Sequence, residues 1–194
     1  MLPLIVGSQS PRRKEIMSFF SLPFEQMSPQ FDEEIIQFDN CPEEYVCAIS
    51  KGKAHSLRHR FQQNIILTAD TIVYRKGKIY GKPKDENDAY QSLLELGGRW
   101  HSVYTGVTVI KEGEEYHQAE ETRVLFNALT SKQIRHYHSK LDWTDKAGGY
   151  AIQMAGGLIV RKIDGCYYNV MGLPINTVRL LLQKFGIDLW DYLK

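Results

Sequence analysis

Leu2-Pro3-Leu4-Ile5-Val6-Gly7-Ser8-Gln9-Ser10-Pro11-Arg12-Arg13 changes from apolar to polar and basic at its central glycine. The apolar part predicts a strand over Leu2–Val6 that is buried along most of its length. Ser10 suits the N-cap of a helix, and Pro11 suits the first helical position because its missing N–H has no partner there. The pattern predicts a strand that runs through a short loop into a helix over Pro11–Phe20.

Two arginines, Arg12 and Arg13, fall in the first turn of this expected helix. The helix dipole disfavours cations at that end, whereas the free N–H groups there attract anions. A bound phosphate would compensate both arginine charges. A solvated helix start with two surface arginines accounts for the segment equally well, so the segment alone leaves both interpretations open.

The size and charge of the chain restrict its class. A length of 194 residues with 43% hydrophobic residues predicts one globular domain, spanning 1–194, with a well-buried core. The chain has 24 Lys and Arg against 23 Asp and Glu, a net charge of +1. This balance argues against a broad binding surface for nucleic acid or for an anionic membrane.

The cysteines and the apolar runs indicate the compartment. Cys41, Cys47 and Cys166 are odd in number and contain no CxxC pair, so we expect free thiols in a reducing environment. The N-terminus has no basic region before its short apolar run, and no apolar run is long enough to span a bilayer. We therefore expect a cytoplasmic protein without a membrane partner.

Strand-like and helix-like segments alternate along the rest of the chain, which predicts an α/β fold with a mixed sheet. The expected strands or extended segments cover Phe24–Ser28, Ile65–Val73, Lys78–Tyr80, Val103–Ile110, Thr122–Phe126 and Leu158–Ile163. The expected helices cover Pro42–Arg58, a segment from an Asp85 cap to Leu96, Ser131–Leu141 after a Thr130–Gln133 capping box, and Ile175–Lys184.

Two charged residues interrupt apolar patterns. Asp70 stands inside the strand-like run Ile65–Val73, where a carboxylate needs a cation, a metal ion or several hydrogen-bond donors. It is a candidate metal ligand or general base, or else an Asp that caps a turn at the strand end. Lys53 falls on the apolar face of the helix Pro42–Arg58, either to reach a buried phosphate or to extend its amine to solvent.

Three further positions carry candidate chemistry. Lys82, between Gly81 and Pro83, is either a fixed loop lysine or an ordinary surface turn. Glu33 belongs to an acidic cluster that could supply a ligand to a hard cation, or could be a solvated turn. Gln153 lies between two Gly-Gly pairs, and its amide suits the edge of a nucleobase, although a flexible loop has the same composition.

Several motifs occur together in a characteristic order. They are Ser8-x-Ser10-Pro11-Arg12-Arg13, Asp32-Glu33, Lys51-Gly52-Lys53-Ala54, Ala69-Asp70-Thr71, Gly81-Lys82-Pro83, Gly98-Arg99-x-His101-x-Val103-Tyr104-Thr105-Gly106-Val107, Asp145-Lys146-Ala147-Gly148-x-Tyr150-x-Ile152-Gln153 and Asn169-Val170-Met171-Gly172-Leu173-Pro174. In this order and spacing the chain resembles the Maf family of nucleoside triphosphate pyrophosphatases, also called septum-formation proteins, from residue 4 to about residue 182.

The resemblance implies a fold and a reaction. The fold is a twisted mixed β-sheet flanked by helices, in two lobes with a central cleft, as in Maf and ITPase-like proteins. The reaction is hydrolysis of a nucleoside triphosphate to the monophosphate and pyrophosphate with a divalent cation, Mg²⁺ or Mn²⁺. The likeness also offers a rival of another class, a nucleotide-binding regulator of cell division without significant turnover.

The resemblance also implies roles for particular residues. Asp70 matches the proton acceptor, and Glu33, with Asp70, matches the metal site. The phosphate-binding positions match Ser8, Arg12, Arg13, Lys53 and Lys82.

The branch of the family that acts on dTTP and UTP resembles this chain most. It carries Arg after Ser-Pro, Thr after the catalytic Asp, and Gln in the Ile-Gln motif, which here are Arg12, Thr71 and Gln153. We expect Gln153, supported by the other two, to bind the edge of a pyrimidine, including modified pyrimidines. A homodimer is compatible with the sequence, which contains no motif that requires one.

Overall fold

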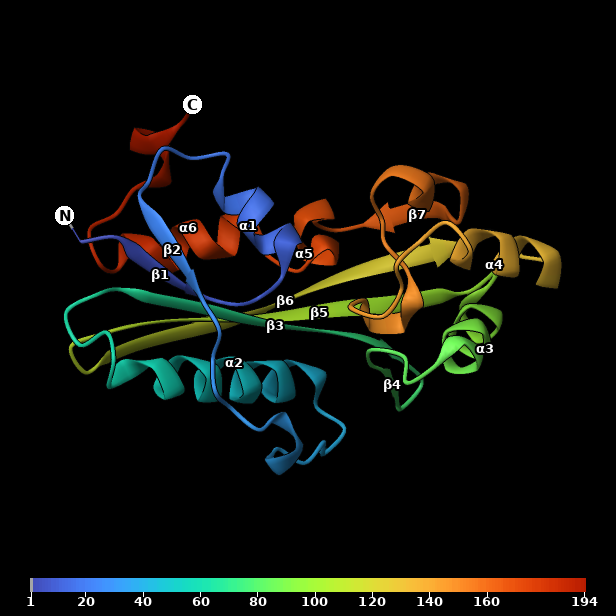
Figure 1. The fold of residues 1–194 in the computed structure, drawn as a ribbon, viewed down its shortest axis with the longest axis horizontal. Helices are drawn as coiled ribbons and strands as arrows, with labels where there is room; N and C mark the ends of the chain where they lie inside the picture. The colour runs from blue at the N-terminus through green and yellow to red at the C-terminus, as the bar shows by residue number, and fades with distance from the viewer. Residues whose placement is uncertain (1) are drawn as a thin grey trace.

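Apolar runs assemble into one mixed β-sheet in the computed structural model, which describes residues 2–194 (Figure 1). The strand order is β2-β1-β3-β5-β6-β7, with β4 paired to β3. Strand β1 runs parallel to β2 and β3, and the remaining pairs are antiparallel. The strands are β1 Leu4–Gly7, β2 Phe24–Met27, β3 Ile66–Arg75, β4 Lys78–Tyr80, β5 Trp100–Lys111, β6 Glu114–Phe126 and β7 Val160–Asp164. The mixed α/β fold expected from the sequence is confirmed.

Helices cover both faces of the sheet. They are α1 Pro11–Met17, α2 Pro42–Arg58, α3 Glu86–Leu96, α4 Ser131–His138, α5 Tyr167–Met171 and α6 Ile175–Gln183. Helices α1, α5 and α6 lie on one face, α2 lies along the other, and α3 and α4 lie at one end of the sheet (Figure 1). Among residues 2–194, no helix combines the length and apolarity that crossing a membrane requires.

Side-chain alternation on the central strand β3 separates two layers of core. Leu67 and Ala69 pack into the cluster that includes side chains of α1 and α6. Ile66 and Ile72 pack on the other face, with side chains of α2. Because successive strand residues point to opposite faces, Asp70 faces α2 and Thr71 faces the layer of α1 and α5.

A glycine allows α2 to approach the sheet closely. A Cβ atom added to Gly106 on β5 would lie 2.4 Å from the backbone carbon of Val46 on α2. Gly106 is paired with Asp70 in the sheet register. Any side chain at this position would push α2 away from the strand that carries Asp70.

The hairpin β5–β6 is much longer than the predicted strands Val103–Ile110 and Thr122–Phe126. Much of β6 from Glu114 to Glu121 is exposed, so its polar residues hid the strand pattern. Pairing is continuous from Trp100 opposite Leu125 to Lys111 opposite Glu114, next to the expected turn.

Several element ends also differ from the predictions. Helix α1 ends at Met17 rather than Phe20, which pairs in an isolated bridge with Leu193. Ser10 occupies the N-cap position, but its side chain makes no capping hydrogen bond. Smaller shifts affect the ends of β1, β2, β3, β7, α4 and α6, and α5 was not predicted because five residues carry too little periodicity. The bounds of α2 and β4, the Asp85 cap and the Thr130–Gln133 capping box are confirmed.

A buried histidine joins the sheet to the loop that follows α4. His101 is 2% exposed on β5, and its Nε2 lies 2.9 Å from the hydroxyl of Tyr150. Its ring also packs edge-on against Phe126. Burial lowers the pKa of His101 from 6.5 to about 4, so the imidazole is neutral in the folded protein at neutral pH.

We predict that this histidine makes stability depend on pH. Its folded pKa lies below its unfolded pKa, so its contribution is complete above about pH 6.5 and is lost as pH falls through about 4. In His101→Gln, the fall in unfolding free energy between about pH 7 and about pH 4 should be smaller by roughly 1–3 kcal/mol than in the wild type. Urea unfolding at both pH values measures this. An equal fall in both proteins would contradict the prediction. His138, whose pKa burial also lowers, is common to both.

Candidate active site

One cleft of about 650 Å³ gathers every site residue predicted from the sequence. Its volume lies in the range of small-molecule binding sites. The predicted residues that line it are Ser8, Arg12, Arg13, Glu33, Lys53, Asp70, Thr71, Lys82 and Gln153. They come from six separate stretches of the chain, which only the folded structure brings together.

The ammonium group of Lys53 lies between two carboxylates. Its Nζ is 2.7 Å from Asp70 Oδ1 and 2.8 Å from Glu33 Oε1. The side chains of Lys53 and Asp70 are each only 11% exposed, so this ion pair is weakly screened by solvent. Lys53 thus satisfies the carboxylate that β3 directs toward α2. The amine of Lys53 therefore binds two carboxylates and does not extend to solvent.

Small residues permit this arrangement. Gly106 lets α2 lie close to Asp70, as described above. On α2 itself, a Cβ atom at Gly52 would lie 2.1 Å from the ring of Phe31. Phe31 stands two residues before Glu33, so its contact with α2 holds the acidic segment beside Lys53.

Arg13 is partly buried and joins three segments. Its Nε donates to the carbonyl oxygen of Gly172 at 2.8 Å, Nη1 donates to Ser8 Oγ at 3.1 Å, and Nη2 donates to Thr71 Oγ1 at 3.1 Å. Burial lowers the pKa of Arg13, while the charge of Asp70 acts in the opposite direction. Gly172 adopts a φ of +101°, which favours glycine. Arg13 therefore holds the loop that carries Ser8 in place.

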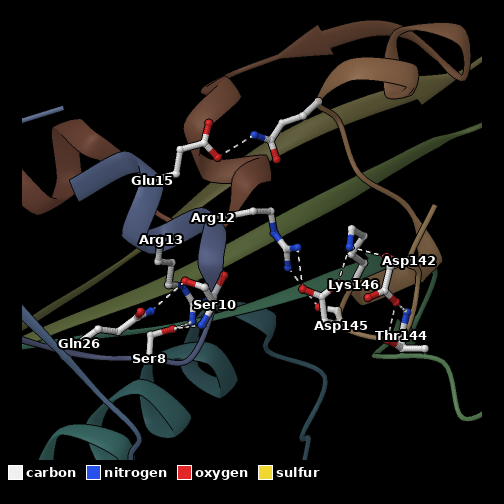
Figure 2. Close-up of polar contacts among 11 residues, drawn as sticks. Ser8, Ser10, Arg12, Arg13, Glu15, Gln26, Asp142, Thr144, Asp145 and Lys146 are labelled. Atoms are coloured by element: carbon white, nitrogen blue, oxygen red, sulfur yellow. Dashed lines mark hydrogen bonds and ion pairs between the residues drawn. The ribbon is translucent and has the colours of Figure 1, made fainter. Parts of the chain in front are cut away.

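Arg12 reaches across the cleft to the segment after α4. Its Nη1 lies 2.9 Å from Asp145 Oδ2, and its Nη2 donates to the Asp145 carbonyl oxygen at 3.1 Å. Figure 2 shows Lys146 at the other carboxylate oxygen of Asp145, where the two residues form an ion pair. Partial burial raises the pKa of Asp145, but hydrogen bonds from Lys146 and Arg12 outweigh it and keep the pKa below its usual value.

Lys82 differs from the other cations of the cleft. It is exposed, and no ion pair or hydrogen bond is found for its amine among residues 2–194. The loop that carries it is held because Gly148 N–H donates to the Gly81 carbonyl oxygen at 2.9 Å. Lys82 is therefore available to a phosphate without losing a protein partner.

The residues expected to read a nucleobase are less close together than predicted. Gln153 Nε2 donates to Glu15 Oε2 at 3.1 Å. Arg12 instead bonds to Asp145, and Thr71 bonds to Arg13 and to Thr105 Oγ1 at 2.9 Å. Neither contacts Gln153 directly, so any support that they give to it passes through the loops that they hold.

Sequence reasoning did not select three residues that the site uses. Asp145 and Lys146 stood inside a quoted motif, but nothing in the local pattern indicated their pairing with Arg12. Glu15 is an exposed helical glutamate, and no local signal distinguishes it from a solvated one.

The two carboxylates fit the expected divalent cation. Glu33 and Asp70 both reach one positively charged atom, Lys53 Nζ, so a single cation can contact both. One or two carboxylates combined with substrate phosphates form the ligand set that Mg²⁺ prefers. Among residues 2–194, no group of three or more His, Cys, Asp or Glu could hold a metal ion, so phosphate oxygens would have to complete the set.

Comparison with known proteins agrees with this geometry. The family model described as Maf-like protein matches residues 3–185. The chain belongs to the Maf family. A dTTP/UTP pyrophosphatase of Chlamydia caviae is 42% identical over 191 residues, covering 98% of this chain and 97% of the relative. A dTTP/UTP pyrophosphatase of Clostridium perfringens is 39% identical over 191 residues, covering 97% of this chain and all of the relative.

A solved structure supports the fold of this Maf-family chain. The Ham1 protein of Staphylococcus aureus superposes with a TM-score of 0.53 at 11% identity, covering 95% of this chain and 100% of that protein. At this identity the likeness concerns the fold alone.

We predict that Lys53 stabilises the cleft by separating two negative charges. Lys53→Met should lower the unfolding free energy at about pH 7 by about 2–4 kcal/mol, because it leaves Asp70 buried without its cation. Denaturant unfolding at about pH 7 measures it. The control is Lys51→Met, whose more exposed pair with Glu115 should contribute under about 1 kcal/mol. Equal losses in both variants would contradict the prediction.

Proposed function

We propose that this chain hydrolyses dTTP and UTP to the nucleoside monophosphate and pyrophosphate. The observation that carries the proposal is the carboxylate of Asp70, held by Lys53 inside a cleft whose other walls present Arg12, Lys146 and Lys82. A carboxylate beside several cations suits proton transfer next to a bound polyphosphate. The names of the relatives supply the nucleotide class.

The basic residues would bind and orient the triphosphate. Lys82 is the first contact because it has no protein partner to give up among the residues that the structure describes. Arg12 and Lys146 would exchange the carboxylate of Asp145 for phosphate oxygens. Arg13 keeps its three protein partners and acts by holding the loop of Ser8.

Asp70 would act as the general base. A water molecule attacks the α-phosphorus as its proton passes to the Asp70 carboxylate, and the bond from that phosphorus to the bridging oxygen breaks. Pyrophosphate leaves with the electrons of that bond. Most of the rate enhancement then comes from positioning and from stabilisation of the phosphate charge.

A divalent cation, Mg²⁺ or Mn²⁺, would be held by Glu33 and Asp70. When bound, such an ion neutralises phosphate charge and lowers the pKa of a water molecule. Lys53 balances the same two carboxylates in the structure described here.

The nucleobase of the substrate would be recognised by Gln153 on the wall of the cleft. The same contact would admit pyrimidines that are modified away from the edge that Gln153 binds. We therefore propose that the enzyme also removes modified pyrimidine nucleotides. The free state of Cys41, Cys47 and Cys166 supports a cytoplasmic setting.

We predict that Asp70→Asn keeps the shape of the site and removes the base. Pyrophosphate release from dTTP and UTP with Mg²⁺ or Mn²⁺ should fall by roughly 10²–10⁴-fold. A folded variant that retains most of its rate would contradict the role of Asp70. Absence of release from any nucleotide by folded, metal-loaded wild type would favour the rival function, a nucleotide-binding regulator without turnover.

We also predict that Gln153→Glu lowers kcat/KM for dTTP and UTP more than for other nucleoside triphosphates. The new carboxylate cannot donate a hydrogen bond to a nucleobase, and it would be repelled by the neighbouring carboxylate of Glu15. Pyrophosphate release from a panel of nucleotides measures this, with Gln9→Glu, an exposed glutamine that also lines the cleft, as the charge-matched control. A loss of equal size on every nucleotide would argue against base recognition by Gln153.

A further inference from the structure

The side chain of Gln153 is held by a residue outside the cleft. Its Nε2 donates to Oε2 of Glu15, which extends from α1 toward the segment that carries Gln153 (Figure 2). Gln153 lines the cleft, whereas Glu15 is exposed and does not line it. The two residues are 138 positions apart in the chain, so the contact exists only in the folded protein.

This contact determines which way the amide faces. An ionised carboxylate has only acceptor atoms, so the NH₂ group of Gln153 must face Glu15. A flipped amide would bring Oε1 against the carboxylate, where two acceptors repel. Gln153 therefore presents Oε1, and the second hydrogen of Nε2, to a ligand in the cleft.

The backbone around Gln153 does not fix the orientation of its amide, which therefore depends on Glu15. Ile152 is 8% exposed and anchors the chain just before Gln153. Met154 turns the chain sharply with a φ of +49° and is 94% exposed. The position of Gln153 is thus set on one side by core packing, while no packed residue directly after it restrains the amide.

The two orientations of an amide select different pyrimidines. Uracil and thymine present an N3–H donor beside the O4 acceptor, which matches an amide oxygen beside an amide N–H. Cytosine presents an N3 acceptor beside an amino donor, which matches the flipped amide. A bonded site rejects a base that leaves these groups unpaired.

We propose that Glu15 is a positioning residue for base specificity, because it holds the Gln153 amide in the orientation that fits uracil and thymine rather than cytosine. The inference rests on the proposed function, in which Gln153 contacts the base. Arg12 lies three positions before Glu15, on the same face of α1, and its side chain binds Asp145. Helix α1 thereby fixes both ends of the segment 145–153.

The test is pyrophosphate release from UTP and CTP by the wild type, Glu15→Gln and Glu15→Lys. A lysine donates to Oε1 and turns the NH₂ group toward the base, so the ratio of kcat/KM for UTP to that for CTP should fall roughly tenfold in Glu15→Lys. Glu15→Gln can pair with either orientation and should give an intermediate ratio. The charge-matched control is Glu25→Lys, an exposed residue of β2 that does not line the cleft and should keep the wild-type ratio.

The ratio is insensitive to general damage, because both nucleotides are measured on one preparation and a partly unfolded variant loses both activities alike. An unchanged ratio in Glu15→Lys, with a wild type that hydrolyses UTP, overturns the role of Glu15 and leaves the proposed function intact. A folded, metal-loaded wild type that releases no pyrophosphate from UTP overturns the proposed function, and this inference with it.

Discussion

The partly buried guanidinium of Arg13 makes the contacts on which the arrangement of the cleft depends. It donates to the loop after β1, to the centre of β3 and to the turn between α5 and α6. A buried cation is costly unless its donors are paired, and a planar group with five donors can pair with several segments at once. Its partner Thr71 is next to Asp70 in the sequence but points to the opposite face of the sheet. One strand thus connects the guanidinium bound on one face of the sheet with the Asp70 carboxylate on the other.

Three cations of the cleft are already paired with carboxylates, whereas Lys82 has no ion pair among residues 2–194. Lys53 is compensated by Asp70 and Glu33, and Arg12 and Lys146 are compensated by Asp145. In the proposed function a polyphosphate gains less from Arg12 and Lys146 than from free cations, because it must replace the Asp145 carboxylate that already pairs with both. Under that proposal the exchange would favour a ligand with several negative charges, because such a ligand can pair with both cations at once.

The sequence predicts those features whose causes are local. Helix α2 has Pro42 at its first position and acidic residues in its first turn, and its bounds were predicted correctly. The polar half of β6 was missed because only its partner strand makes it a strand. The family resemblance selected nine residues that prove to line one cleft. Their partners could not be predicted, because Arg13 and Gly172 are 159 positions apart and Glu15 is an ordinary surface residue in the sequence.

The long separation of Arg13 from its acceptor has a consequence for the order of folding. Strands β3 to β6 pair mainly with their neighbours in sequence, so this antiparallel part of the sheet closes short loops and can form early. The loop of Ser8 and Arg13 is synthesised before the Gly172 carbonyl that holds it, which follows Arg13 by 159 positions. The nascent protein therefore carries Asp70 before the loop beside it can be held, and this part of the cleft is completed only after Gly172 has been synthesised.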